Sequence, residues 1–160
     1  MAERNPDNIE RIKITAYEPA FGIIGDPAKR NLKTRQSADH SMVYIVATLL
    51  RKAFDKMDQV KDAKDVDDMW KTLMLTPLDY SKSAITNETT RKFMDKIDFA
   101  HGGVDYDNKY PEGIPTSVEI RLKTGKIFDS GLVMFPGGHS RNDTVSLNEV
   151  LKHKFKLLGN

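Results

Sequence analysis

Regular alternation of apolar and polar residues marks the first predicted element, at residues 9–17. Ile12, Ile14 and Ala16 fall on one side of this stretch, and Arg11, Lys13, Thr15 and Tyr17 fall on the other. A period of two residues is typical of a strand with one buried face. We therefore expect a strand here, followed by a loop over residues 18–31, which hold two prolines and two glycines.

A second alternating stretch, residues 116–135, has the pattern of a β-hairpin. Apolar residues alternate from Val118 to Leu122, and Thr124–Gly125 then offers a turn. Short turns with glycine between two alternating runs favour antiparallel strands. We expect the return strand to run from Ile127 to Met134.

Helical spacing of apolar residues predicts the remaining elements. The longest helix should extend from about Asp39 to Phe54, with Ser37 or Asp39 as its N-cap, because a short side-chain oxygen can accept an unpaired N–H of the first turn. Dense charge of both signs over residues 51–71 indicates a solvated excursion that contains a second, short helix. Further helices are expected after Thr86 or Asn87, running out into an extended segment at 97–100, and from a capping box at Ser146 and Glu149 to Gly159.

This order of elements predicts an α+β fold. We expect one domain over residues 1–160, built on a small antiparallel or mixed sheet that includes the hairpin and is packed with about three to four helices.

Composition narrows the chemistry without defining it. The 160 residues contain 39% apolar and 30% charged residues, a net charge of +2 and no cysteine. The absence of cysteine excludes a thiolate nucleophile and an iron–sulfur cluster held by this chain, and the absence of a basic block speaks against nucleic acid as a partner. No run is long enough for a membrane span, and the polar first ten residues lack a signal-peptide core.

The start of the long helix carries the first candidate site. His40 is either a cap residue at the surface or a donor to an anion, since a helix N-terminus favours negative ligands. Tyr44, one turn further on, is either a core residue with a satisfied hydroxyl or a neighbour of His40 on a binding face.

A second candidate lies in the segment "GGHSRN". His139 and Arg141, placed after two glycines, would suit a carboxylate, but a surface turn explains the same letters. The roles of His101 and His153 stay open, and the four histidines lack the spacing of metal ligands, so we expect no metal.

Four segments in order resemble the C-terminal domain of the MmgE/PrpD family, which includes 2-methylcitrate dehydratase. They are "RQSADHSMVYIVATLL", "LTPLDYSKSAITNETTRKFMDKIDF", "IPTSVEIRLKTGKIFDSGLVMFPGGHSRN" and "LNEVLKHKFKLL". The resemblance runs from about Asn8 to the end of the chain. The segment around residues 53–74 is longer than in many relatives.

The resemblance implies a domain of a hydro-lyase, inactive alone, whose helical domain is missing from this chain. It implies Tyr44 as a catalytic residue and no cofactor. We expect His40, one turn away, to be catalytic too, and His139 and Arg141, which match a family motif, to bind substrate. The implied reaction dehydrates 2-methylcitrate to a methylaconitate in propionate catabolism, the methylcitrate cycle. A cis-aconitate decarboxylase, an iminodisuccinate epimerase and a non-catalytic interaction or dimerisation module remain alternatives.

The resemblance also sets expectations about partners and location. We expect a small tricarboxylate substrate, the missing helical domain and a second copy in a homodimer, with neither nucleic acid nor membrane. The protein should be cytoplasmic, or in the mitochondrial matrix of a eukaryote. The isolated domain should expose an apolar patch where the helical domain docks, supplied mainly by the long helix.

Overall fold

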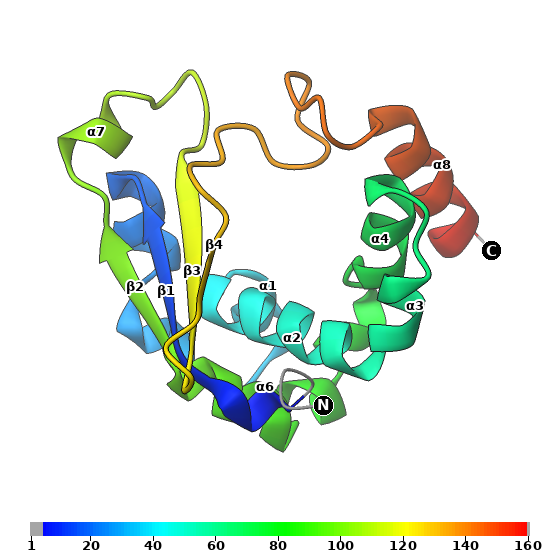
Figure 1. The fold of residues 1–160 in the computed structure, drawn as a ribbon, viewed down its shortest axis with the longest axis horizontal. Helices are drawn as coiled ribbons and strands as arrows, with labels where there is room; N and C mark the ends of the chain where they lie inside the picture. The colour runs from blue at the N-terminus through cyan, green and yellow to red at the C-terminus, as the bar shows by residue number, and fades with distance from the viewer. Residues whose placement is uncertain (1–4, 160) are drawn as a thin grey trace.

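A computed structural model describes residues 5–159 of the chain (Figure 1). The expectations for residues 1–4 and for residue 160, at the two ends of the predicted domain, lie outside this range. Among the described residues, none of the helices is both long and apolar enough to cross a membrane.

The described strands form one mixed sheet in the order β2-β1-β3-β4. β1 (Ile9–Ala16) lies parallel to β2 (Ile97–His101) and antiparallel to β3 (Thr116–Leu122), which pairs with β4 (Ile127–Asp129). Alternation had predicted β1 and the hairpin, and the segment after the helix that follows Asn87 had been predicted as extended; all three are confirmed. Gly125 turns the hairpin with φ +85°, a conformation that suits glycine because it has no Cβ.

The return strand of the hairpin is shorter than predicted. The ladder ends at Asp129, and pairing resumes only at the single bridge between Thr116 and Val133. Between them, the hydroxyl of Ser130 accepts the backbone N–H of Val118, and Gly131 has φ +64°. A side chain thus takes over a ladder bond and a left-handed glycine redirects the chain, which alternation alone does not reveal.

Four helices of eight or more residues account for most of the described helical structure, as predicted. They are α2 (Met42–Asp55), α4 (Val66–Leu73), α6 (Glu88–Asp95) and α8 (Leu147–Leu158). Single helical turns fill the expected loops and links. They are the π-helical turn Ala20–Ile24, the 3₁₀ turns Pro6–Asn8, Pro27–Arg30 and Pro77–Tyr80, and α1 (Arg35–Asp39), α3 (Met57–Lys61), α5 (Lys82–Ile85) and α7 (Val104–Asp107).

The prediction that the long helix begins at Asp39, capped by Ser37 or Asp39, is wrong. Ser41 adopts an extended conformation, and its Oγ accepts the N–H of Tyr44 at 3.3 Å, so α2 begins at Met42. Ser37 instead belongs to the capping box of α1 with Thr34, and Asp39 bonds to the ring of His40.

The core lies between β1, β2 and the two helices α2 and α6. Ile12, Ile14 and Ile97 of the sheet are at most 1% exposed, as is Phe93 of α6, and they pack in one cluster with the buried side of α2. Arg11 and Lys13 point to the other, solvated side of β1. One sheet face therefore carries the core, as the alternation predicted.

Two arginine side chains tie the crossover between β1 and β2 to this core. The guanidinium of Arg91, on α6, donates to the carbonyl oxygens of Ile85, Arg30 and Leu32 at 2.8–3.1 Å. Arg30 in turn donates to the carbonyl oxygens of Met94 and Ile97. Arg91 thus supplies donors to carbonyl groups at the ends of α5 and of the turn Pro27–Arg30, where a helix leaves carbonyl groups without intrahelical partners. Arg30 reaches the last turn of α6 and the first residue of β2.

The elements form an open arch (Figure 1). The sheet stands on one side, α2 runs along the base, and α3, α4 and α8 rise on the other side. The chain between β4 and α8 returns over the top of the view.

We predict that Arg91→Ala lowers the free energy of unfolding by about 2–3 kcal/mol, because it removes a charged donor and leaves partly buried carbonyl groups without a partner. Urea titration followed by circular dichroism measures the change. Lys92→Ala, at the exposed neighbouring position, should stay within about 0.5 kcal/mol of the wild type. Equal stability of the two variants would contradict the role given to Arg91.

Candidate functional site

His40 lies at the surface between α1 and α2. Its side chain is 67% exposed, and its Nδ1 lies close to the carboxylate of Asp39 and 3.1 Å from the carbonyl oxygen of Gln36. The hydrogen bond to Asp39, followed by that to Gln36, raises the pKa of the His40 ring above its ordinary value. The ring therefore stays protonated to a higher pH than an ordinary histidine, and in its protonated form it presents a positive charge and an N–H group to an anion.

Tyr44 is fully buried in the core. Its hydroxyl donates to the backbone carbonyl oxygen of Asp79 at 2.6 Å, and its ring lies 6.0 Å from that of Tyr80 at a tilted angle. Burial raises the pKa of the Tyr44 phenol. Tyr44 thus lies in the core, whereas His40 lies at the surface, and the two side chains do not share an exposed face.

Asp79 gathers the charged groups that sequence reasoning missed. Its Oδ2 accepts from the ammonium of Lys52 at 2.9 Å and from the N–H of Thr76 at 2.8 Å, and Arg51 lies 3.8 Å from its Oδ1. Lys52 also donates to the carbonyl oxygen of Met74 at 2.6 Å. Lys52 and Asp79 are largely buried, with 11% and 12% of their side chains exposed.

Hydrogen bonds and a neighbouring cation keep Asp79 ionised although its carboxylate is largely buried. Burial alone would raise the pKa of this carboxyl, but the N–H of Thr76 and the ammonium of Lys52 together lower it below its ordinary value. The Lys52–Asp79 pair therefore has the features of a structural ion pair, because its buried polar atoms all have partners.

The signal that could have pointed to this network was weak but present. Lys52 is a lysine on a mostly apolar helix, and Asp79 is an acidic residue in a link with proline. The sequence does not show that Lys52 and Asp79 form a pair, because only the fold brings the two residues together.

The segment with His139 and Arg141 is organised by its own side chains. Nδ1 of His139 accepts the N–H of Arg141 at 3.1 Å, and its ring stacks on Phe135 with centroids 5.0 Å apart. The guanidinium of Arg141 donates to Glu112 at 3.0 Å and lies over the same Phe135 ring. Arg141 is exposed, so its free edge can meet an anion.

The structure does not bring the predicted site residues together. Residues 130–146 cross the top of the view in Figure 1, whereas α1 and the start of α2 lie below them. Among residues 5–159, moreover, no three histidine, aspartate or glutamate side chains gather as metal ligands would. The chain therefore offers two separate polar surfaces rather than one assembled active site.

The two remaining histidines have local partners. His101 Nε2 lies 2.9 Å from the carboxylate of Asp107, and its ring stacks on Phe21. His153, on α8, meets the ring of Trp70 edge-on at 6.4 Å. Both contacts join neighbouring elements, which is a packing role.

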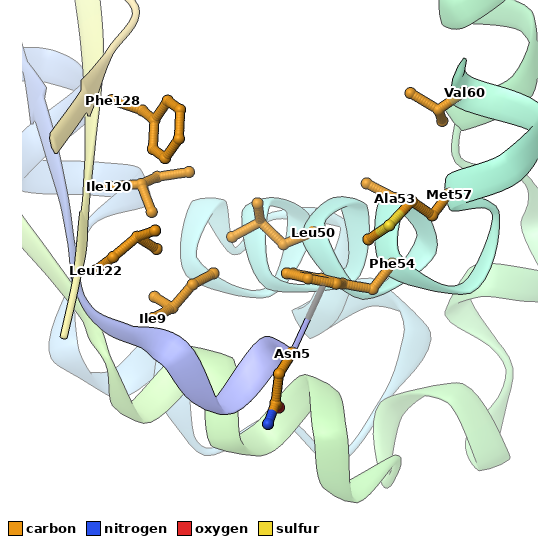
Figure 2. Close-up of a pocket in the computed structure, with 10 residues that line it drawn as sticks. All are labelled: Asn5, Ile9, Leu50, Ala53, Phe54, Met57, Val60, Ile120, Leu122 and Phe128. Atoms are coloured by element: carbon orange, nitrogen blue, oxygen red, sulfur yellow. The ribbon is translucent and has the colours of Figure 1, made fainter. Parts of the chain in front are cut away.

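The concave side of the arch holds an apolar groove. It has a cavity volume of about 300 Å³. Side chains of the sheet and of α2 and α3 point into one common space (Figure 2). The groove is lined by Asn5, Ile9, Leu50, Ala53, Phe54, Met57, Val60, Ile120, Leu122 and Phe128.

A second hollow of about 360 Å³ lies between α2 and α4. It is lined by Leu49, Val66, Met69, Trp70, Leu73, Met74 and Leu75. We call the two hollows together the concave face. The predicted apolar patch beside the long helix is thus present, and α2 contributes Leu49, Leu50, Ala53 and Phe54 to it.

We predict that the stability of the domain falls as the pH drops below about 4. The folded pKa of Asp79 lies below the unfolded value, so the stability that this group contributes is present above the unfolded pKa. It is lost as the pH falls through the folded pKa, because the unfolded chain binds the proton first. Unfolding free energies measured by urea titration between pH 3 and about 7 report this loss.

Asp79→Asn tests the assignment, because it breaks the buried pair with Lys52 and should cost about 3 kcal/mol at neutral pH. Its stability should also change less between neutral and acid pH than that of the wild type. Asp55→Asn is the matched control, since Asp55 pairs with Arg51 at an exposed position. An unchanged acid dependence in Asp79→Asn would remove Asp79 as its source.

Comparison with known proteins adds one finding. A model of the MmgE/PrpD C-terminal domain matches residues 1–75, a stretch that includes β1 and α1 to α4. The resemblance of the later segments, from the link at residues 75–81 to α8, stays a prediction. No curated protein matches the chain.

Proposed function

From the match of residues 1–75 to the MmgE/PrpD C-terminal domain model, we propose that the chain serves a dehydratase that converts 2-methylcitrate to a methylaconitate. The family match is the observation that carries the proposal. The domain would form one wall of a cleft and would need a helical domain for the other wall.

The reaction sets the requirements on both walls. A base takes the proton alpha to a carboxylate, its electron pair forms the new double bond, and an acid protonates the departing hydroxide to give water. Cationic groups must also hold three carboxylates and stabilise the developing charge. The described residues offer cations and N–H donors but no buried base that faces an open cavity, so we propose that this chain binds and orients substrate.

His40 is the residue that we propose to contact a substrate carboxylate. Support comes from its exposure, from the raised pKa of its ring and from its place beside the first turn of α2. Arg141 and His139 are proposed to meet a second carboxylate, brought near when the partner domain closes the cleft. Tyr44 is proposed to act from within the core, by holding the carbonyl group of Asp79 and so the link that follows α4.

We expect the chain alone to show no dehydration of 2-methylcitrate, because the described residues present no group placed to remove the proton. Mixed with the helical domain of a 2-methylcitrate dehydratase that lacks its own C-terminal domain, it should restore turnover. Formation of the unsaturated product, followed by its ultraviolet absorbance, measures the result. Citrate and cis-aconitate serve as competing substrates, and restored turnover of one of these alone would contradict the proposed substrate.

Tyr44→Phe should lower turnover in the restored enzyme at least about tenfold. It should also lower the free energy of unfolding by about 1 kcal/mol, because the carbonyl oxygen of Asp79 loses its donor. Tyr106→Phe is the matched control, because it removes a partly buried hydroxyl pair with Ser117 elsewhere in the domain. Loss of stability without loss of turnover would restrict Tyr44 to packing.

A further inference from the structure

Arg35 and Lys29 carry charges that the fold itself does not use. Arg35 begins α1 and is exposed, and among residues 5–159 it is the one arginine whose guanidinium makes neither a hydrogen bond nor an ion pair. The ammonium of Lys29, in the turn Pro27–Arg30, also has no such partner in this part of the chain. The arginines that do have partners are Arg11, Arg30, Arg51, Arg91, Arg121 and Arg141. Both cations can therefore pair with an anion from outside the chain.

Hydrogen bonds bring these two cations to His40 from two sides. Oγ of Ser41, the residue after His40, donates to the carbonyl oxygen of Lys29 at 2.9 Å, which holds the turn Pro27–Arg30 against the start of α2. Arg35 lies one helical turn before Asp39 on the same side of α1, and Asp39 bonds to the ring of His40. The hydrogen bond to Asp39 is the main cause that raises the pKa of this ring, and the nearby charge of Lys29 acts against it.

Tyr80 places a hydroxyl group beside the same charges. Burial raises the pKa of its phenol, the carboxylate of Asp39 adds to this effect, and the guanidinium of Arg35 opposes it, so Tyr80 lies close to both charges. Its hydroxyl makes no hydrogen bond within the described residues, and it is not among the buried polar atoms that lack a partner there. The hydroxyl therefore reaches the surface as a neutral donor, whereas that of Tyr44 is used inside the core.

We propose that Lys29, Arg35 and Tyr80 join His40 in one substrate-binding site, which we call the α1 site. Each cation can hold one carboxylate, the guanidinium in a bidentate pair, and the Tyr80 hydroxyl can donate to an oxygen of the ligand. Asp39 offsets one of the positive charges, and the remaining excess favours a ligand with two or more carboxylates over one with a single carboxylate. Tyr80, rather than Tyr44, is the tyrosine that contacts the ligand.

The choice of ligand rests on the proposed function, because the α1 site is where the proposed substrate would bind. The site adds three residues that the sequence motifs did not indicate. It also means that this chain binds a polycarboxylate before any helical domain is present. None of the residues of the α1 site lines the concave face, so the two surfaces have separate roles.

Isothermal titration calorimetry of the full chain with citrate, a tricarboxylate probe, tests the α1 site. Citrate should bind the wild type, and acetate and inorganic phosphate should bind at least about tenfold more weakly. Lys29→Gln and Arg35→Gln should each weaken citrate binding at least about fivefold, because each removes a charged donor. Lys13→Gln removes the same charge from an exposed position on the solvated side of β1, and should change citrate affinity less than about twofold.

Three results would overturn the α1 site. The first is a wild-type chain that does not bind citrate. The second is phosphate that binds as tightly as citrate, and the third is equal weakening in Lys13→Gln and in the two variants of the site. The last two would show a general effect of positive charge.

Tyr80→Phe separates contact with the ligand from packing. It should weaken citrate binding at least about threefold and leave the free energy of unfolding unchanged, because the hydroxyl has no partner in the described chain. Tyr106→Phe, which removes a hydroxyl elsewhere in the domain, should leave citrate binding unchanged. A loss of stability without a loss of citrate affinity would restrict Tyr80 to packing.

The α1 site and the proposed function can be tested apart. Citrate binding that depends on Lys29 and Arg35, without turnover in the mixture with a helical domain, would support the site and contradict the dehydratase. Restored turnover with an unchanged KM in Arg35→Gln would support the dehydratase and overturn the site. A raised KM in Arg35→Gln, with a smaller change in kcat, is the result expected if both hold.

Discussion

Asp79 joins the turn Pro77–Tyr80 to α2 through both its backbone carbonyl group and its carboxylate. The carbonyl oxygen of Asp79 accepts from Tyr44 near the start of α2, and its carboxylate accepts from Lys52 two turns later. The turn Pro77–Tyr80 is therefore held along the helix at two points. The chain beyond this turn runs through α5 and α6 to β2, which pairs with β1 in parallel. Parallel strands need a long crossover connection, and this turn is part of it. The buried ion pair thus helps to hold the crossover that leads to β2.

Local patterns predicted the elements because their causes are local. Alternation reflects the pleat of β1 and β3, and the caps at Asn87 and Ser146 need only a side-chain oxygen and a nearby N–H. Prediction was wrong where three possible N-caps compete, at Ser37, Asp39 and Ser41. The structure selects Ser41 because its hydroxyl also donates to the carbonyl oxygen of Lys29, a contact that only the fold creates.

The candidate site was less predictable, because it depends on contacts between distant segments. The sequence indicated that polar groups gather at the start of α2, and they do. It did not indicate that Tyr44 turns inward to Asp79 while His40 stays outside. Likewise, the glycines before His139 suggested a ligand loop, whereas the ring of Phe135 organises that loop from within. Residue types identified the polar positions, and packing decided which of them face solvent.

The concave face is an apolar surface that the described residues do not cover. Apolar side chains from the sheet, α2 and α3 surround a space that the described residues leave open, and water there is unfavourable because so few polar atoms line the groove. The proposed enzyme needs a helical domain to form the other wall of its cleft, and contact with that domain would remove these apolar side chains from water. The same contact would bring the second wall of the cleft toward α2, whose first turn lies beside His40.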